Sequence, residues 1–212
     1  FEPELVFIRN DLIFFDKKGS IIRFDEKSKI KWKVNYYNKK EKKLPPILKI
    51  AKVGNNLLIT DNLAKLYLLD ASNGKLIWKN EHKVFFISQI KVDRDRFYVL
   101  DASNIFTCYS LSNGKKIWEF KGETKLINSQ QQTSVIINNE NVIFNNSKGE
   151  IISLDKMSGN LNWLTPTIEY GESLQSFLVK NSDLVLNDDS IYFSNTNNSF
   201  FSLDVNLGLV NW

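Results

Sequence analysis

Short apolar runs alternate with small polar turns along the whole chain. The runs are four to seven residues long, rich in Ile, Val, Phe, Tyr and Leu, and bounded by Asn, Asp, Ser and Gly. Runs of this length between such boundaries are typical of β-strands joined by hairpin turns. Apolar positions at helical spacing are nowhere sustained over about a dozen residues. The pattern therefore predicts an all-β protein.

The runs recur in a fixed order. Each of NLLITD (56–61), RFYVLD (96–101), NVIFNN (141–146) and SIYFSN (190–195) is followed by a second run and then by a tryptophan, and DLIFFD (11–16) begins an earlier copy. The tryptophans lie 46, 40, 45 and 49 positions apart, at Trp32, Trp78, Trp118, Trp163 and Trp212. A period of about 40 to 50 residues is the signature of a repeat protein. Four strands per period predict a small antiparallel sheet, and radial repetition of such sheets is a β-propeller.

Each tryptophan closes a short motif. DASNGKLIW (70–78) recurs as SLSNGKKIW, DKMSGNLNW and DVNLGLVNW, and in degraded form as FDEKSKIKW (24–32). We expect the acid to accept hydrogen bonds from turn amides, the glycine to supply a positive φ, and the tryptophan to dock against the neighbouring blade. The predicted docking residues besides the five tryptophans are Asp70, Asp155, Asp204, Gly74, Gly114, Gly159 and Gly208. Ser110 replaces the acid in one copy, and the degraded copy has Lys29 at the glycine spacing, which predicts a looser or differently built turn.

The motif resembles the tryptophan-docking motif of quinoprotein-type (PQQ-like) β-propeller repeats, usually ALDxxTGKxxW. LLDASNGKLIW (68–78) is the nearest copy. The resemblance implies one propeller segment over residues 1–212, with about five four-stranded antiparallel blades. We expect the blades at approximately 1–36, 46–80, 84–121, 132–166 and 174–212. Propellers of this repeat type usually have more blades, so the resemblance implies part of an eight-bladed ring, and a closed five-bladed ring is the alternative.

The resemblance also implies a function. The short, compact blades are most similar to the non-enzymatic BamB family of outer-membrane assembly factors. This likeness implies a scaffold without cofactor that binds a β-barrel assembly subunit. It also implies a periplasmic location at the inner face of the outer membrane, with membrane attachment only through a lipid anchor outside this segment.

Two alternatives remain open. The first is a fragment of a PQQ-dependent dehydrogenase whose active-site residues lie elsewhere. Such enzymes resemble this chain in their repeats but often carry a vicinal cysteine pair, and Cys108 is the only cysteine here. The second is a propeller sensor that binds peptides or unfolded chains. For this segment we expect no catalytic, cofactor-binding or metal-binding residues.

Charge adds one feature. The net charge is a modest +4, from 28 basic and 24 acidic residues. The densest basic cluster is NKKEKKLPP (38–46), which we interpret as a solvated loop, the other hypothesis being an anionic partner or a membrane surface. The stretch 29–43 comes closest to a nucleic-acid-binding pattern, but Tyr36 and Tyr37 are its only aromatic residues outside the repeat motif, and we expect no nucleic-acid partner.

Other polar groups have an ordinary structural interpretation. His82, the only histidine, lies in a charged connection where a solvated side chain is expected. The acidic stretches DRDR (93–96) and NDD (187–189) fall at predicted turns, where they need no metal. No apolar run approaches the roughly 18 residues that cross a bilayer. The chain begins at Phe1 without a recognisable signal peptide, so we expect the natural start to lie elsewhere.

Partner binding is predicted at one set of turns. Strands of a blade are used for packing, whereas loops are free to carry function. The turns between the second and third strands recur at one end of every blade, so we expect them to gather on one face. Their candidate residues are Asp61, Asn62, Asp101, Asn104, Asn146, Lys148, Asn195 and Asn197.

Overall fold

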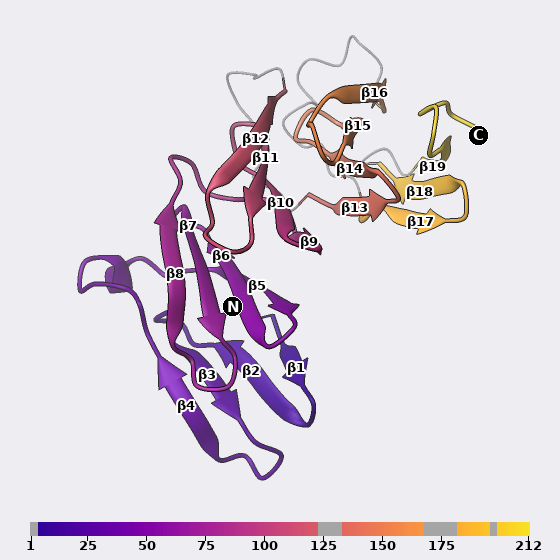
Figure 1. The fold of residues 1–212 in the computed structure, drawn as a ribbon. Coiled ribbons are helices and arrows are strands. Elements are labelled where there is room, and N and C mark those ends of the chain that lie inside the picture. Colours follow the sequence, from indigo (N-terminus) through magenta and orange to yellow (C-terminus); the bar gives the residue numbers. More distant parts are fainter. Residues whose placement is uncertain (1–3, 123–132, 168–181, 196–198) are drawn as a thin grey trace. The chain divides into compact units, whose positions relative to one another are not determined.

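A computed structural model of the chain describes residues 4–122, 133–167, 182–195 and 199–212 (Figure 1). These residues form five antiparallel sheets, four with four strands and one with three. The strands of each sheet follow one another in sequence order, which is the topology of propeller blades. The prediction of an all-β fold built from such blades is confirmed.

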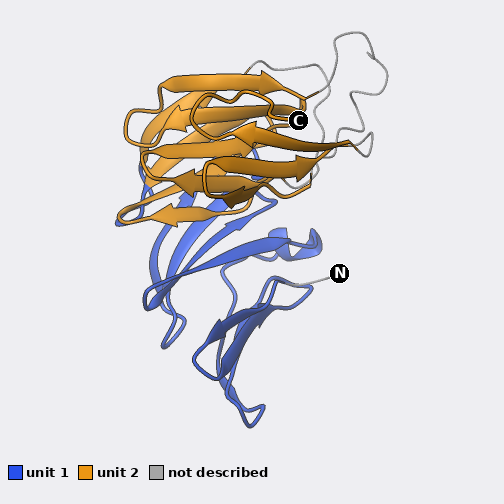
Figure 2. Ribbon diagram, turned by 90° about the vertical axis from the view of Figure 1, so that its right-hand side faces the viewer, with its two compact units in different colours: residues 1–86, 110–115 blue, residues 87–109, 116–212 orange. Residues whose placement is uncertain are grey.

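The chain divides into two compact units, which we describe separately (Figure 2). Unit 1 comprises residues 1–86 and 110–115, and unit 2 comprises residues 87–109 and 116–212. In the described part of the chain, no helix has the length and apolar character needed to cross a membrane.

Unit 1 contains the first two sheets. The first consists of β1 (Val6–Ile8), β2 (Asp11–Phe15), β3 (Ile21–Phe24) and β4 (Ile30–Val34). The second consists of β5 (Leu48–Val53), β6 (Asn56–Asp61), β7 (Lys65–Asp70) and β8 (Leu76–Glu81), and the 3-10 helix η1 (Glu41–Lys43) lies between the two sheets in the sequence. Burial alternates along β2, whereas β6 and β7 are buried at nearly every position. Inner strands of a sheet that is covered on both faces have this continuous burial.

Unit 2 contains the other three sheets. Ser110, the last residue of one strand in the third sheet, is assigned to unit 1. The third sheet consists of β9 (Lys91–Asp93), β10 (Arg96–Leu100), β11 (Ile105–Ser110) and β12 (Lys116–Lys121). The fourth consists of β13 (Val135–Asn138), β14 (Asn141–Asn145), β15 (Glu150–Asp155) and β16 (Leu161–Pro166). The fifth consists of β17 (Val185–Asn187), β18 (Ser190–Ser194) and β19 (Phe200–Asp204). Beyond β19 the backbone N–H groups of Asn211 and Ser202 donate to Ser202 and Trp212, so residues 210–212 run beside β19.

Every four-stranded sheet has a β-bulge immediately before its tryptophan. In the second sheet Leu69 pairs with Leu76 and Leu68 pairs with Trp78, so Ile77 is the extra residue. The same register shift precedes Trp32, Trp118 and Trp163. A bulge bends its strand and re-aims the side chain that follows it. The orientation of each tryptophan is therefore set by strand pairing as well as by the turn.

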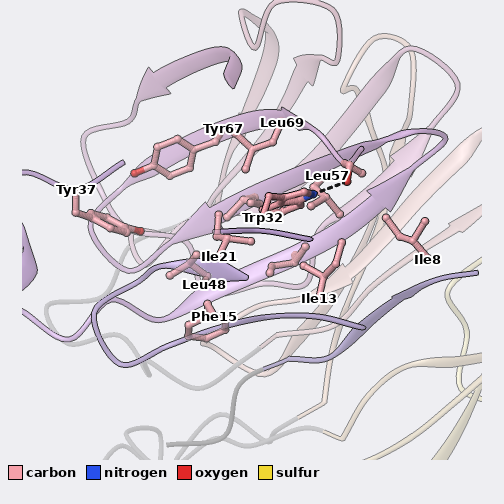
Figure 3. Packing of buried hydrophobic residues seen from close by; sticks show 13 residues of the cluster. Ile8, Ile13, Phe15, Ile21, Trp32, Tyr37, Leu48, Leu57, Tyr67 and Leu69 are labelled. Carbon is pink, nitrogen blue, oxygen red and sulfur yellow. Dashed lines mark hydrogen bonds between the residues drawn. The ribbon is translucent and has the colours of Figure 1, made fainter. Parts of the chain in front are cut away.

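Hydrophobic clusters join consecutive sheets within each unit. In unit 1, Ile13, Phe15 and Trp32 of the first sheet pack with Leu57 and Leu69 of the second (Figure 3). In unit 2, a second cluster combines Ile143 and Ile151 with Ile191, Phe193 and Leu203. The sheets are held together by burial of apolar side chains, the main favourable term in folding.

Candidate functional site

The turns between second and third strands are closed by a repeated side-chain contact. Oδ1 of Asp61 accepts the backbone N–H groups of Leu63, at 2.9 Å, and Lys65, at 2.8 Å. The first-position residues Asp16, Asp101 and Asn146 make the equivalent pair of contacts to residues two and four positions later. A short carboxylate or amide side chain that bonds turn amides stabilises the turn. These polar side chains are therefore part of the fold.

The fourth position of the same turns has a left-handed backbone. Its φ is +73° at Gly19, +63° at Ala64, +59° at Asn104 and +79° at Gly149. Asparagine tolerates this region better than most residues, and its side chain remains available for a contact. Oδ1 of Asn104 accepts the Ser147 hydroxyl at 2.8 Å, which links two turns of unit 2.

The structure places the predicted partner-binding residues in these turns, mostly as buried groups. The buried ones are Asp61, Asp101, Asn104, Asn146 and Asn195. Asn62 and Lys148 are partly exposed, whereas Asn197 lies outside the described residues. In this structure the acids and amides close the turns, and the positions between them are more exposed except at Ser147. Partner binding by these residues stays a prediction.

Asp61 is the most deeply embedded of these acids. Its Oδ2 accepts the hydroxyl of Tyr37 at 2.5 Å and that of Tyr67 at 3.4 Å. Burial raises the pKa of Asp61 above its ordinary value, although the hydrogen bond from Tyr37 opposes the shift. Burial and the nearby carboxylate also raise the pKa of both tyrosines, which keeps their hydroxyls as donors.

The turns of the tryptophan motif use their acids in a similar way. Oδ1 of Asp70 accepts the amide of Ser72 at 2.7 Å and its hydroxyl at 2.6 Å. These hydrogen bonds lower the pKa of Asp70, with the Ser72 hydroxyl as the largest cause. Asp155 and Asp204 accept amides two and three residues later.

Two copies depart from this pattern. Asp25 closes a shorter turn by accepting the amides of Lys27 and Lys29, each at 2.9 Å, and Ser28 has a φ of +60°. This turn is differently built, and it has the form of the turns between second and third strands. In another copy, the hydroxyls of Ser110 and Ser112 lie 2.9 Å apart where the acid would stand.

Each motif glycine lies against the tryptophan of the preceding repeat. A Cβ placed on Gly74 would lie 2.8 Å from Cε3 of Trp32, and the backbone φ there is +74°. Gly114, Gly159 and Gly208 have φ of +66°, +77° and +68° and similarly approach Trp78, Trp118 and Trp163. Glycine is therefore required both by the turn and by the close approach of the indole ring.

The indole N–H groups reach the same turns. Nε1 of Trp32 donates to the carbonyl of Ala71 at 3.1 Å (Figure 3). Nε1 of Trp78 donates to Leu111 at 2.9 Å, and that of Trp163 to Val205 at 3.2 Å. The acceptor always directly follows the first residue of the motif. Trp212, by contrast, is 62% exposed and lies beside Tyr192 and Phe200.

Trp118 is the exception. Its buried Nε1 has no hydrogen-bond partner among the described residues. The equivalent acceptor is the carbonyl of Lys156, which instead accepts the hydroxyl of Tyr98 at 3.1 Å. The rings of Tyr98 and Trp118 lie 5.9 Å apart. The sequence signal is that Tyr98 stands where three other repeats have Ile13, Leu58 and Ile143, whereas the last repeat has Tyr192.

Other chemically interesting residues have structural partners. Asp93, in the stretch considered for metal binding, pairs with buried Lys156 at 2.9 Å. The ring of His82 lies 5.1 Å from that of Phe86. Burial raises the pKa of the Cys108 thiol to about 11. Within the described ranges, no group of three or more His, Cys, Asp or Glu residues is arranged to hold a metal ion.

A family model described as outer membrane protein assembly factor BamB matches residues 17–212. The chain belongs to the BamB family. This match confirms the resemblance that the motif DASNGKLIW indicated.

The individual proteins that this chain resembles are distant in sequence. An uncharacterized protein of Rickettsia conorii is 26% identical over 163 residues, which cover 76% of this chain and 39% of that protein. The structure of BamB from Moraxella catarrhalis has a TM-score of 0.76 at 16% identity, covering 99% of this chain and 62% of that one. The quinohemoprotein alcohol dehydrogenase from Comamonas testosteroni has a TM-score of 0.73 at 12% identity, covering 97% of this chain and 41% of that one. The two structural likenesses show the fold alone, and the chain spans less than two thirds of each of these proteins.

Proposed function

We propose that the chain is part of a non-enzymatic propeller scaffold that assists the assembly of outer-membrane β-barrel proteins. The observation that carries the proposal is the match of the BamB family model to residues 17–212. In this proposal the five sheets form one propeller segment within an eight-bladed ring. The scaffold lies in the periplasm at the inner face of the outer membrane and binds a β-barrel assembly subunit.

The tryptophan contacts support a rigid scaffold. In this proposal the indole of Trp32 docks the first blade to the turn of the next through Ala71, and Trp163 does the same through Val205. Burial of an indole at roughly 25 cal/mol per Å² supplies stability that the local hairpins lack. A rigid scaffold loses little conformational entropy when it binds a partner.

The partner surface is proposed at the middle positions of the turns between second and third strands. The first-position acids and amides are occupied in closing these turns. Most of the described middle positions are more exposed, with buried Ser147 as an exception, and they vary in chemistry along the chain, as residues 17–18 and 62–63 show. Residues that vary between otherwise identical turns are suited to specific recognition.

Lys18 provides the test, with Lys27 as its matched control. Both are exposed lysines whose backbone N–H donates to a turn aspartate at 2.9 Å. They belong to the two different turns that flank β3 in the first sheet. We expect Lys18→Glu to weaken binding of the full-length protein to the periplasmic domains of the barrel-assembly subunit by about tenfold, as a reversed rim charge does. Lys27→Glu should leave binding within about twofold.

Biolayer interferometry with the purified subunit measures the difference. Absence of binding by the unmodified protein would overturn the proposed function. Equal loss in both variants would overturn the assignment of the surface while leaving the scaffold role in place.

A segment of a PQQ-dependent dehydrogenase is the second candidate. The likeness to a quinohemoprotein alcohol dehydrogenase favours it, although at 12% identity that likeness concerns the fold. Asp93 does not suit a calcium site in this structure because it is paired with Lys156. Addition of PQQ and Ca²⁺ to the full-length protein tests this candidate. A stoichiometric shift in the quinone absorption spectrum would support the enzyme over the scaffold.

A further inference from the structure

The basic run between the first two sheets forms an ordered surface loop. We call residues 38–46 the lysine loop. It includes η1, and its four lysines are all exposed: Lys39, Lys40, Lys42 and Lys43. Among the described residues, no acidic side chain pairs with any of these four ammonium groups. The loop therefore presents four uncompensated positive charges within a few residues.

The acid that interrupts the run is paired with a lysine outside the loop. Glu41 forms an ion pair with Lys65, whose side chain is only 5% exposed. Its second carboxylate oxygen accepts the backbone N–H of Asn38 at 2.8 Å. The hydrogen bond from Lys65 lowers the pKa of Glu41 and so keeps it ionised. Counting charges along the sequence gives the loop +3, whereas its exposed face has the full charge of the four lysines.

Contacts on both sides fix the loop to the second sheet. Before the loop, Tyr37 is buried and donates its hydroxyl to Asp61. At its far end, Oδ1 of Asn62 accepts the N–H of Ile47 at 2.7 Å, and Nδ2 donates to the carbonyl of Pro45 at 3.3 Å. A loop that is already ordered does not lose much entropy when it meets a partner.

Two exposed aliphatic side chains lie at the end of the lysine run. Leu44 and Ile47 are each 56% exposed. Flexible lysines beside aliphatic groups suit a diffuse anionic surface with an apolar interior, whereas carboxylate recognition favours the planar fork of arginine. Tyr37 is buried and Tyr36 packs partly buried against the hydrophobic cluster of unit 1, so their rings contribute to the core and are not displayed for stacking on bases.

We propose that the lysine loop binds the surface of a bilayer that contains anionic phospholipid. The four lysines would lie at the headgroup phosphates, and Leu44 and Ile47 would enter the interface between headgroups and acyl chains. The proposal goes beyond the scaffold function and does not depend on it, because binding of the loop to lipid requires no protein partner.

Vesicle co-sedimentation of the full-length protein, purified without attached lipid, tests the proposal. The two vesicle types are phosphatidylcholine with phosphatidylglycerol in equal parts, and phosphatidylcholine alone. One variant replaces the four loop lysines by glutamine. The matched control replaces four exposed lysines elsewhere in unit 1, namely Lys17, Lys18, Lys27 and Lys29. Both variants lose the same formal charge, and a thermal melt checks that both remain folded.

We expect the unmodified protein to partition onto the anionic vesicles and not onto phosphatidylcholine alone. Each lysine near an anionic surface is worth about a fivefold change in partitioning, so the loop variant should lose about 100-fold or more. The control variant should lose less than about tenfold. The double variant Leu44→Ser and Ile47→Ser should also partition less onto the anionic vesicles. This loss should be the same at about 0.1 M and about 0.5 M salt, because salt screens charges and not the burial of aliphatic groups.

Three results would overturn the proposal. They are no partitioning of the unmodified protein, equal partitioning onto both vesicle types, and equal loss in the loop and control variants. A polyglutamate peptide is included as a probe for an acidic polypeptide partner. Its capture by the loop, without vesicle binding, would assign the lysines to a protein partner instead. None of these results depends on binding of the barrel-assembly subunit.

Discussion

Trp163 and Trp118 occupy equivalent places in consecutive repeats of unit 2, but their indole N–H groups differ. Trp163 donates to the carbonyl of Val205 at 3.2 Å. Trp118 donates to no described residue, and the equivalent carbonyl, that of Lys156, accepts the hydroxyl of Tyr98. Leaving a buried donor without a partner costs about 1–3 kcal/mol, so the two contacts are not energetically equivalent.

What the two contacts share is packing. The ring of Trp163 faces Gly208, and the ring of Trp118 faces Gly159. Both glycines have a positive φ, and at each a Cβ would overlap the indole ring. We infer that the close approach of ring and glycine is the constant part of the repeat contact. The hydrogen bond from the indole N–H is not constant, because another donor, here the Tyr98 hydroxyl, can bond to the turn carbonyl instead.

Removal of the ring should have the largest effect. We expect Trp163→Ala to lower the free energy of unfolding by about 3–5 kcal/mol, because it leaves a cavity and an unpaired carbonyl at Val205. Trp118→Ala should cost about 1 kcal/mol less, since Tyr98 still satisfies Lys156. Urea denaturation followed by circular dichroism measures both values. A loss below about 1 kcal/mol for Trp163→Ala would show that the ring contributes little.

The next largest effect should come from crowding the ring. In Gly159→Ala the new Cβ would lie 2.6 Å from Cε3 of Trp118, at a φ of +77°. Overlap and backbone strain together should cost about 2–4 kcal/mol. Gly54→Ala is the control, because φ there is +57° and nothing lies within 4 Å of the added atom. It should cost only about 1 kcal/mol, and equal thermal shifts for the two variants would contradict the packing argument.

Much of this arrangement could be predicted from local sequence. The strands follow from short apolar runs with turn residues at their ends, and the blade repeat follows from the spacing of the tryptophans. The roles of turn acids such as Asp70 and glycines such as Gly74 are also local, because each acts within about four residues. The turns of the candidate surface were located for the same reason.

The remainder depends on contacts between distant residues. The bulge before each tryptophan is decided by pairing with another strand, which no local pattern specifies. Tyr98 meets Lys156, and Lys65 meets Glu41, across 58 and 24 positions. Burial of Asp61 also depends on Tyr37, from the connection between the first two sheets. Tyr98 was the one available signal, because three other repeats have an aliphatic residue at this position and buried hydroxyls need partners.

A smaller effect should separate the two hydrogen bonds. Trp163→Phe keeps most of the packing and loses the bond to Val205, so it should cost about 1 kcal/mol more than Trp118→Phe. Trp118→Phe removes an indole N–H that has no acceptor among the described residues. Because a buried unsatisfied donor is unfavourable, its removal offsets part of the free energy that is lost from packing. Differential scanning calorimetry of the two variants checks the order. A larger cost for Trp118→Phe would mean that its N–H has a partner in solution.

Tyr98→Phe sharpens the same comparison. It removes the competing hydroxyl and should cost about 0.5–1.5 kcal/mol alone. If the Trp118 indole then donates to Lys156, Trp118→Phe should cost about 1 kcal/mol more in this background than in the unmodified protein. A double-mutant cycle measures that coupling energy. Additive costs would show that the carbonyl and the indole cannot meet.

The smallest effect concerns the acid that begins the turn facing Trp118. Hydrogen bonds from the amide and hydroxyl of Ser158 lower the pKa of Asp155 below its ordinary value of 3.8. A carboxyl whose pKa is lower in the folded state stabilises the fold above its unfolded pKa, and this contribution is lost as the pH falls through the folded value. We therefore expect stability to decline as the pH falls below about 4, and Asp155→Asn to flatten this part of the profile. Ser112→Ala, in the repeat where Ser110 replaces the acid, should leave the slope unchanged, and thermal melts between about pH 2 and pH 6 measure both. An unchanged slope in Asp155→Asn would show that this carboxylate is bonded equally well in the unfolded chain.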